Sequence, residues 1–337
     1  MNQSYSTADK QDTRQAQRFS STSIAVLTIY SLVVLMIFGS RLVSPSLGGL
    51  SQLMTVLYLS SFLVICAFGQ GLVIMVRGLD LSVASMITLG GVLSTTFMQG
   101  TNEGLYFIIP GILLISALVG VISGFGITRL SIPPFIMTMA MGLIVYSVCL
   151  GFTEGTPRGF PAPILNAFMQ SKVFGVALPI LLMLILIVIF TTLQSYSAFG
   201  RKLNAVGNNP DAANIAGITV KRMTISAYAI SAACSALAGV LLAAYANGAT
   251  LRMGDDYLLP SIAAVVVGGS SILGGRGNFL GTVGGALLLT TLSSMLSALG
   301  VGQGWKTVLE GVVILVALLM LREQVFASLQ SMFKRSS

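Results

Sequence analysis

Residues able to do chemistry are sparse in this chain, and their types narrow its function. The 337 residues include no histidine, which excludes serine–histidine catalysis, histidine metal sites and histidine proton relays. The G-x-x-x-x-G-K-[ST] loop that binds nucleotide phosphates is also missing. Asp80 and Glu310 are the two candidate carboxylates in or beside the long apolar segments, a thin supply for an ion-coupled carrier. We expect a transporter driven by partners rather than an enzyme, with no metal or cofactor in this chain.

One polar island, residues 200–222, interrupts long apolar stretches. Within it, NNPDAANIAG predicts a short helix, because Asn209 is a good cap, Pro210 suits a first turn and Gly217 suits a C-terminal stop. The alanines between them give this helix a face of small side chains that another surface could approach closely. The simpler interpretation is an ordinary loop, but a plain loop needs no capped helix.

Two further corners combine glycine with polar residues. MVRGLDLSVAS (75–85) contains Arg77, and either Asp80 or Ser82 is placed to cap the helix that follows. GGSSILGGRGNFLGTVGG (268–285) contains eight glycines, and most of these have their simplest explanation in close helix packing. The turn GGRGN (274–278) predicts a short corner comparable with the first one.

The elements that position these residues must be membrane helices. Hydrophobic residues make up 55% of the chain and charged residues 8%, with mean hydropathy +0.91, whereas soluble domains average about 25% charged residues. LPILLMLILIVIF (178–190) lacks the alternation of a barrel strand. We therefore expect an all-α membrane protein of about ten transmembrane helices, with the transmembrane domain over 24–321. The spans predicted are 24–40, 52–76, 82–99, 105–128, 133–151, 173–194, 223–246, 257–273, 278–299 and 307–321.

Charge orients these segments. If both ends of the chain face the cytoplasm, that side holds 13 of the 18 lysines and arginines and the other side holds 5, as the positive-inside rule requires. The tails 1–23 and 322–337 are then cytoplasmic, and 1–23 is expected to be disordered. The net charge of +8 is a topology signal, since no cluster of cations and aromatics suggests nucleic-acid binding. Spans 2–5 begin outside and spans 7–10 begin inside, which predicts an inverted repeat.

Three stretches together resemble a known family. GLDLSVAS (78–85), FGRKLNAVGNNPDAANIAGITVKR (199–222) and IAAVVVGGSSILGGRGNFLGTVGGALL (262–288) are similar, in this order, to the permease subunits of ribose-type bacterial ABC sugar importers. The likeness extends over about 55–320. Two positions depart from the family: glycine is usual where Ala84 stands, and isoleucine is commoner than Leu79.

The resemblance implies a role for the polar island. Such permeases carry a cytoplasmic coupling loop, here 195–222, whose short helix sits in a cleft of the ATPase. The importer pattern E-A-A-x-x-x-G reads here Asp211, Ala212, Ala213 and Gly217, with aspartate replacing glutamate. The residues assigned to ATPase coupling are Asn209, Pro210, Asp211, Ala212, Ala213 and Gly217, with Ala213 on the expected docking face.

The resemblance also implies partners and a substrate class. The chain would work in the bacterial inner membrane as one of two permease copies, identical or paralogous, surrounded by lipid. A periplasmic binding protein would deliver a sugar-like solute, and ATP would be used by the partner ATPase. Rival interpretations are a related permease for branched-chain amino acids or nucleosides, and a secondary transporter without an ATPase. Candidate pathway residues are Asp80, Ser82, Gly268, Gly269 and Ser270.

Overall fold

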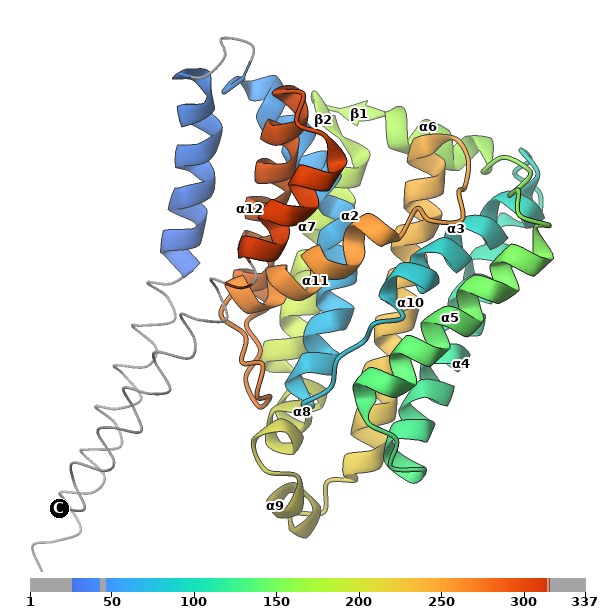
Figure 1. Ribbon diagram of the computed structural model, residues 1–337, viewed down its shortest axis with the longest axis vertical. Coiled ribbons are helices and arrows are strands. Elements are labelled where there is room, and N and C mark those ends of the chain that lie inside the picture. The colour runs from blue at the N-terminus through green and yellow to red at the C-terminus, as the bar shows by residue number, and fades with distance from the viewer. Residues whose placement is uncertain (1–25, 43–46, 314, 316–337) are drawn as a thin grey trace, which may run out of the picture.

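The computed structural model describes residues 26–42, 47–313 and 315, and these form a bundle of helices (Figure 1). The tails predicted over 1–23 and 322–337 lie outside the described residues, as does the end of the predicted span 307–321. Two two-residue strands are the only strands within the described part of the chain. The expectation of an all-α membrane protein is therefore confirmed.

The helices follow the apolar segments in order. An apolar helix Val26–Leu42 comes first and ends in the 3₁₀ turn η1, Ser40–Leu42. The elements after it are α2 (Leu50–Met75), α3 (Val83–Met98), α4 (Leu105–Arg129), α5 (Pro134–Phe152), α6 (Pro163–Gln170), β1 (Lys172–Val173), β2 (Val176–Ala177), α7 (Leu178–Thr191), the π-helical turn η2 (Thr192–Tyr196), α8 (Ala198–Asn208), α9 (Pro210–Ile215), α10 (Val220–Ala246), α11 (Asp255–Val267) and α12 (Phe279–Ala298). Residues 303–313 are also helical.

Length separates these helices into two groups. Among the described residues, six helices are long and apolar enough to cross a membrane: α2, α4, α5, Leu178–Tyr196, α10 and α12. Val26–Leu42 and α3 are apolar but shorter, and α11 has 13 residues. A helix rises 1.5 Å per residue, so α11 spans only about 20 Å.

Two predicted boundaries were wrong. The span predicted to start at 173 begins with an antiparallel hairpin, in which Lys172 pairs with Ala177 and Val173 with Val176, and its helix starts at Leu178. The span predicted over 257–273 is helical only to Val267, because the glycine pair 268–269 ends it. It also starts earlier than predicted, so Asp255 and Asp256 form its first turn.

Two helices form the centre of the bundle. In the most apolar 18 residues of each helix, 83% of the residues are buried in α2 and 61% in α10, against 17% in α4 and 28% in α5. Helix α2 packs on α7, α11 and α12, whereas α10 packs on α3 and α4, and the two helices also contact each other. Small residues permit the close approach, since a Cβ on Gly69 would collide with Ser231 and one on Gly90 with Ala236.

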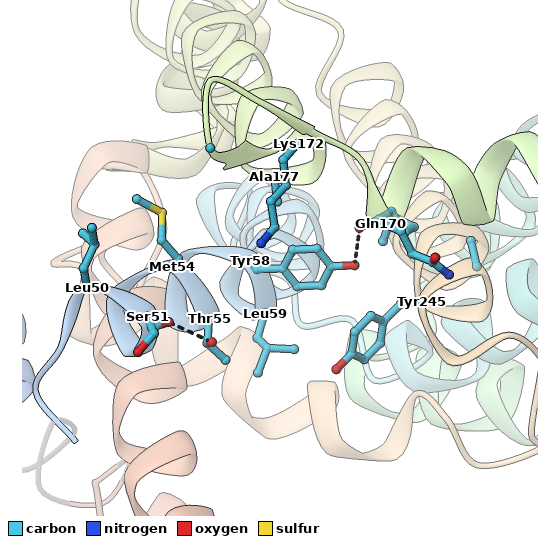
Figure 2. Close-up of a pocket in the computed structure, with 13 residues that line it drawn as sticks. Leu50, Ser51, Met54, Thr55, Tyr58, Leu59, Gln170, Lys172, Ala177 and Tyr245 are labelled. Atoms are coloured by element: carbon cyan, nitrogen blue, oxygen red, sulfur yellow. Dashed lines mark hydrogen bonds between the residues drawn. The ribbon is translucent and has the colours of Figure 1, made fainter. Parts of the chain in front are cut away.

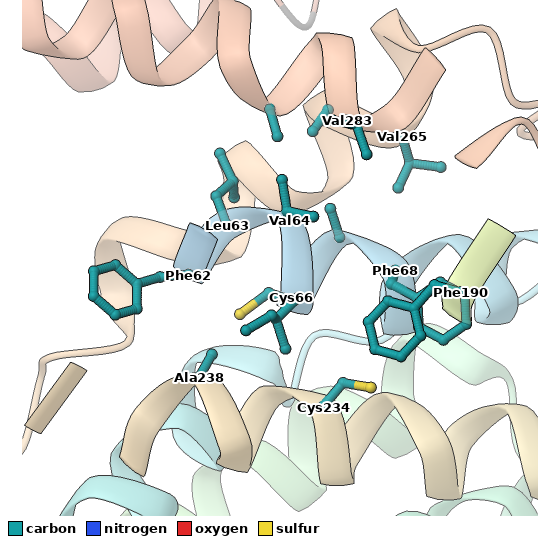
Figure 3. Packing of buried hydrophobic residues seen from close by; sticks show 14 of the residues in the cluster. Phe62, Leu63, Val64, Cys66, Phe68, Phe190, Cys234, Ala238, Val265 and Val283 are labelled. Atoms are coloured by element: carbon teal, nitrogen blue, oxygen red, sulfur yellow. The ribbon is translucent and has the colours of Figure 1, made fainter. Parts of the chain in front are cut away.

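The core between these helices is apolar and tightly packed (Figure 3). The rings of Phe68 on α2 and Phe190 on α7 stack with centroids 3.8 Å apart. Cys66 and Cys234 are buried free thiols in the same cluster, and Cys149 is buried and free elsewhere. The cysteines thus serve as small apolar side chains.

Candidate functional site

The short helix predicted in the polar island exists as α9. The Asn209 Oδ1 accepts hydrogen bonds from the backbone N–H groups of Asp211 at 3.0 Å and Ala212 at 3.1 Å, and Pro210 occupies the first turn. Gly217 has φ +80°, a left-handed conformation that glycine adopts without penalty. The predicted cap, first turn and stop are confirmed.

The exposed face of α9 differs from the one predicted. Ala213 is only 3% exposed and packs into its own chain, so it cannot lie on a docking surface. The exposed residues are Asp211, Ala212 and Ile215 with their neighbours, and Ile215 is 89% exposed. Sequence reasoning missed Ile215, an almost fully exposed apolar side chain on a helix that lies outside the apolar spans.

A second missed residue, Arg77, ties the end of α2 to the end of α8. Its Nε donates a hydrogen bond to the Gly207 carbonyl at 2.6 Å, and its Nη2 donates to the Asn208 carbonyl at 2.7 Å. These carbonyls directly precede the cap residue Asn209. A lone cation at the end of an apolar span, as Arg77 is in the sequence, can satisfy free helix-end carbonyls.

The glycine corner 274–278 completes this junction. The Gly275 N–H donates to the Met75 carbonyl at 2.9 Å, and the Asn208 Nδ2 donates to the Gly275 carbonyl at 3.0 Å. Gly207 fits because a Cβ there would collide with the backbone of Met75 and Gly275. We call this meeting of α2, α8 and the corner the inner junction, defined by Met75, Arg77, Gly207, Asn208 and Gly275.

Asp80 and Ser82 lie in the non-helical segment between α2 and α3. The Asp80 Oδ1 accepts from the Ser82 N–H at 3.0 Å and from its hydroxyl at 2.6 Å, and its Oδ2 accepts from the Ser231 hydroxyl on α10 at 2.8 Å. Ser82 precedes α3 but its side chain makes no capping bond, so of the two expected caps only Asp80 accepts a backbone N–H, that of Ser82, at the entry to this helix. Both residues are buried, and the Asp80 carboxylate accepts hydrogen bonds from Ser82 and Ser231.

Gly268, Gly269 and Ser270 shape the turn between α11 and α12. Gly268 packs against the backbone of Gly281 and Thr282, where a Cβ would collide. Gly269 takes φ +84°, and the Ser270 hydroxyl oxygen accepts from the Asn278 N–H at 3.0 Å. Close packing and turn geometry explain these residues, as the simpler interpretation of the glycine-rich stretch proposed.

A cavity of about 700 Å³ opens between α2, the β1–β2 hairpin and α10 (Figure 2). We call it the tyrosine cavity, because Tyr58 and Tyr245 meet there with ring centroids 5.4 Å apart. The Tyr58 hydroxyl donates to the Met169 carbonyl at 3.1 Å. Lys172, Gln170, Ser51 and Thr55 add polar groups to the lining, which includes none of the five predicted pathway residues.

Comparison with known proteins places the chain in a family. Residues 52–318 match the family described as "Branched-chain amino acid transport system / permease component". The ribose import permease protein RbsC of Escherichia coli (strain K12) is 32% identical, covering 87% of this chain and 92% of the relative. The fructose import permease protein FrcC of Rhizobium meliloti is 32% identical, covering 93% and 89%.

A third relative, the galactose/methyl galactoside import permease protein MglC of Escherichia coli (strain K12), is 30% identical, covering 81% of this chain and 87% of the relative. No solved structure matches the chain. The family match spans the inner junction, the polar island and the glycine corner together, so the resemblance noted from three stretches extends along nearly the whole bundle. This chain belongs to the family of branched-chain amino acid transport system permease components, within which these sugar import permeases are its relatives.

Proposed function

We propose that this protein is the multi-pass, membrane-spanning permease subunit of an ATP-driven, binding-protein-dependent importer of a sugar or sugar-like solute in the bacterial inner membrane. Its relatives are permeases named for ribose, fructose and galactose import. ATP is bound and hydrolysed by a partner ATPase, since this chain carries no phosphate-binding loop. The observation that carries the proposal is the capped helix α9, which presents Ile215 and follows directly after the end of α8 that Arg77 binds.

The proposed topology has ten crossings with both ends in the cytoplasm. The distribution of cations supports this orientation, and a helix occupies each of the ten predicted segments as far as the described residues extend. The packing supports the inverted repeat of predicted spans 2–5 with spans 7–10. Helix α2, in the first set, packs on α11 and α12 of the second, while α10, in the second set, packs on α3 and α4 of the first. In such repeats the pathway lies between the halves.

Coupling would run from α9 to α2. Ile215 would enter a cleft of the ATPase, because burying an isoleucine side chain stabilises a contact by about 1.5–3 kcal/mol. Movement of α9 would reach Asn208 and Gly207 directly through the chain, and the Arg77 hydrogen bonds would pass it to the end of α2. Asn209, Pro210, Asp211, Ala212 and Gly217 shape and present this helix, and Ala213 anchors it.

The remaining partners follow from the two ends of the bundle. A periplasmic binding protein would deliver solute at the end opposite α9, and a second permease copy, identical or paralogous, would complete the pathway. The mostly exposed apolar surfaces of α4, α5 and α7 would contact lipid or that copy. Uptake of amino acids is the second candidate, because the family description names branched-chain amino acids.

The test uses the full chain in proteoliposomes with its ATPase and binding protein. We expect ATP-dependent uptake of at least one of D-ribose, D-fructose and D-galactose, and none of L-leucine. Ile215→Asp should weaken ATPase co-purification about 10-fold or more, since it removes an apolar contact and adds an unpaired charge. Leu130→Asp is the matched control, because Leu130 is also an exposed apolar residue, 64% exposed, in a loop outside the coupling loop.

Two outcomes would count against the proposal. Uptake of L-leucine without uptake of any of the three sugars would favour the amino-acid permease. Normal ATPase binding by Ile215→Asp would mean that α9 is not the docking helix. Leu130→Asp should insert and bind the ATPase like the wild type, so a general loss of folding would be recognised by its effect on both variants.

A further inference from the structure

A second cavity, of about 210 Å³, lies between α11, α12 and the helix 303–313. We call it the polar cavity, because hydroxyl, carboxylate and carboxamide side chains make up much of its lining. The lining residues are Leu59, Leu63, Asp256, Tyr257, Pro260, Leu289, Thr290, Ser293, Ser294, Ser297, Gln303 and Glu310. Such a concentration of polar groups is unusual beside membrane helices, where unpaired polar atoms are costly.

One wall of the polar cavity is a row of hydroxyls on α12. Thr290, Ser293, Ser294 and Ser297 stand at i, i+3, i+4 and i+7, the spacing that places side chains on one helical face. Serine and threonine in apolar helices commonly bond the carbonyl one turn earlier, and Thr291, which faces the core, does so to the Leu287 carbonyl. The Thr290, Ser293 and Ser294 hydroxyls make no hydrogen bond within the described part of the chain.

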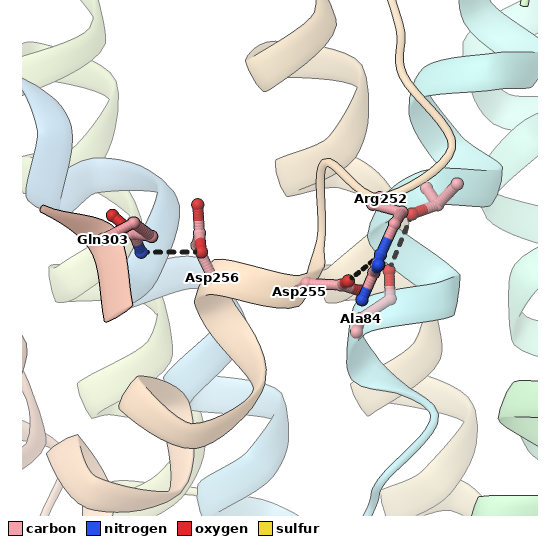
Figure 4. Close-up of polar contacts among 6 residues, drawn as sticks. Ala84, Arg252, Asp255, Asp256 and Gln303 are labelled. Atoms are coloured by element: carbon pink, nitrogen blue, oxygen red, sulfur yellow. Dashed lines mark hydrogen bonds and ion pairs between the residues drawn. The ribbon is translucent and has the colours of Figure 1, made fainter. Parts of the chain in front are cut away.

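The facing wall carries the acceptors. Asp256 stands in the first turn of α11, and its Oδ1 accepts from the Gln303 Nε2 at 3.0 Å (Figure 4). Glu310 follows Gln303 by seven residues, so both lie on one face of the helix 303–313. Glu310 is half-buried, and its carboxylate has no hydrogen-bond partner among the described residues.

The position of the polar cavity joins it to the tyrosine cavity. Leu59 on α2 belongs to the lining of both. Both cavities lie toward the end of the bundle at which α2 begins and α12 ends, opposite the inner junction. Under the proposed topology this is the periplasmic end, where solute enters.

We propose that the polar cavity is a transient binding site for a neutral polyhydroxylated solute in the outer half of the permease. Sugar hydroxyls both donate and accept, so they can donate to the Asp256 and Glu310 carboxylates and exchange bonds with the serine and threonine hydroxyls. Among the described residues at the cavity, two carboxylates stand against one cation, Lys306, whose Nζ donates to the Ser297 hydroxyl at 2.7 Å, and this balance disfavours anionic solutes. The inference rests on the proposed function and names the class of solute and its site.

The first test compares hydroxyl removals on two faces of α12. The double variant Ser293→Ala, Ser294→Ala should raise the KM for the transported sugar about 5- to 10-fold, the effect expected from losing one or two neutral hydrogen bonds, while the ATPase remains bound. Glu310→Gln should raise the KM by a similar or larger factor because it replaces a charged acceptor. Thr291→Ala removes a hydroxyl outside the cavity and should leave the KM unchanged.

The second test asks whether solute reaches the row of hydroxyls on α12, called the hydroxyl stripe below. In a chain whose Cys66, Cys149 and Cys234 are replaced, Ser294→Cys in the assembled transporter should react with a small charged thiol reagent. D-ribose, D-fructose or D-galactose, whichever the wild type transports, should slow that reaction in the presence of the binding protein, and modification should stop uptake. Thr291→Cys should stay unreactive because Thr291 is fully buried.

Several results would overturn the inference without touching the proposed function. These are unchanged KM in the stripe variants, unchanged uptake after modification of position 294, and a disulfide between two copies through position 294, which would make the stripe a subunit contact. If the wild type transports none of the sugars in the panel, the proposed function itself fails. The wild-type uptake assay therefore separates the two failures.

Discussion

Two non-helical segments, 76–82 before α3 and 247–254 before α11, contrast in how they use their charges. In the first, Arg77 bonds to residues 207 and 208, and Asp80 bonds to Ser231, all more than 100 positions away in the chain. At the end of the second, the Arg252 Nε donates to the Asp255 Oδ2 at 2.6 Å, only three residues away (Figure 4). The first segment is fixed to the bundle by its charges, whereas the charged pair beside the second is local and exposed.

This difference separates a carboxylate that holds the bundle together from one that a solute can reach. Both carboxylate oxygens of Asp80 accept hydrogen bonds from the protein, and Asp80 is only 1% exposed, so a solute does not reach it. Asp256, in the turn that follows the second segment, faces a cavity and is exposed. Charge inside a membrane protein often marks a pathway, but here the burial and bonding of each carboxylate decide which one can meet a solute.

The second segment also touches the start of α3. Gly254 packs so closely against the backbone of Ala84 that a Cβ would collide with the Ala84 carbonyl. Ala84 is the position where the resembling family usually has glycine, so this departure lies where the start of α3 meets the segment before α11. The departure noted in the sequence thus bears on how the starts of α3 and α11 fit together.

The largest expected effect follows from removing the buried carboxylate. Asp80→Ala would leave the Ser82 and Ser231 hydroxyls without their acceptor in a buried site, at a cost of about 3 kcal/mol or more. We expect a clear drop in the melting temperature of the detergent-purified protein and low membrane abundance. Asp80→Asn keeps the shape and one acceptor oxygen, and it should lie between the alanine variant and the wild type.

This prediction tests the comparison directly. If Asp80→Ala melts like the wild type but loses transport, Asp80 would be a pathway residue as the sequence first suggested. Asp256→Ala supplies the contrast, because its exposed carboxylate should contribute little to the melting temperature.

The second effect concerns coupling rather than folding. Arg77→Gln removes a charged fork that binds two carbonyls, and hydrogen bonds from charged donors contribute about 1.5–3 kcal/mol each. We expect the ATPase to remain bound while uptake falls about 10-fold or more, a loss that corresponds to one such hydrogen bond. Uptake and ATPase co-purification measured on the same preparation would separate coupling from docking.

Arg276→Gln is the matched control for the inner junction. Arg276 stands next to Gly275 and is exposed, and its side chain makes no hydrogen bond or ion pair among the described residues. Its loss should leave uptake near the wild-type level. Equal losses in both variants would show that positive charge at this face matters, and the specific Arg77 contacts would not be needed.

Sequence reasoning predicted local features well and long-range contacts poorly, for physical reasons. The cap at Asn209 and the stop at Gly217 depend on neighbouring residues, and both are confirmed. The burial of Ala213 and the exposure of Ile215 depend on which side of α9 meets the bundle, which two helical turns do not specify. The hydroxyl stripe on α12 had a visible signal in its helical spacing, but only the fold places Asp256 and Glu310 opposite it.

The smallest effect is expected from the exposed pair beside the second segment. Arg252 and Asp255 have side chains 79% and 46% exposed, and water and salt screen such pairs. Arg252→Ala should therefore leave the melting temperature within error of the wild type at moderate salt. Its hydrogen bond to Asp255 raises the pKa of the Arg252 guanidinium. A cation with a raised pKa stabilises the fold fully at pH values below its ordinary pKa, and this stabilisation is lost only as the pH rises through the raised pKa. Because that range lies above pH 12, Arg252 should add no pH dependence between pH 5 and 9, so melting curves of Arg252→Ala and wild type should run parallel there. A drop comparable with that of Asp80→Ala would show that the second segment is fixed by its charges as firmly as the first, and the contrast between them would fail.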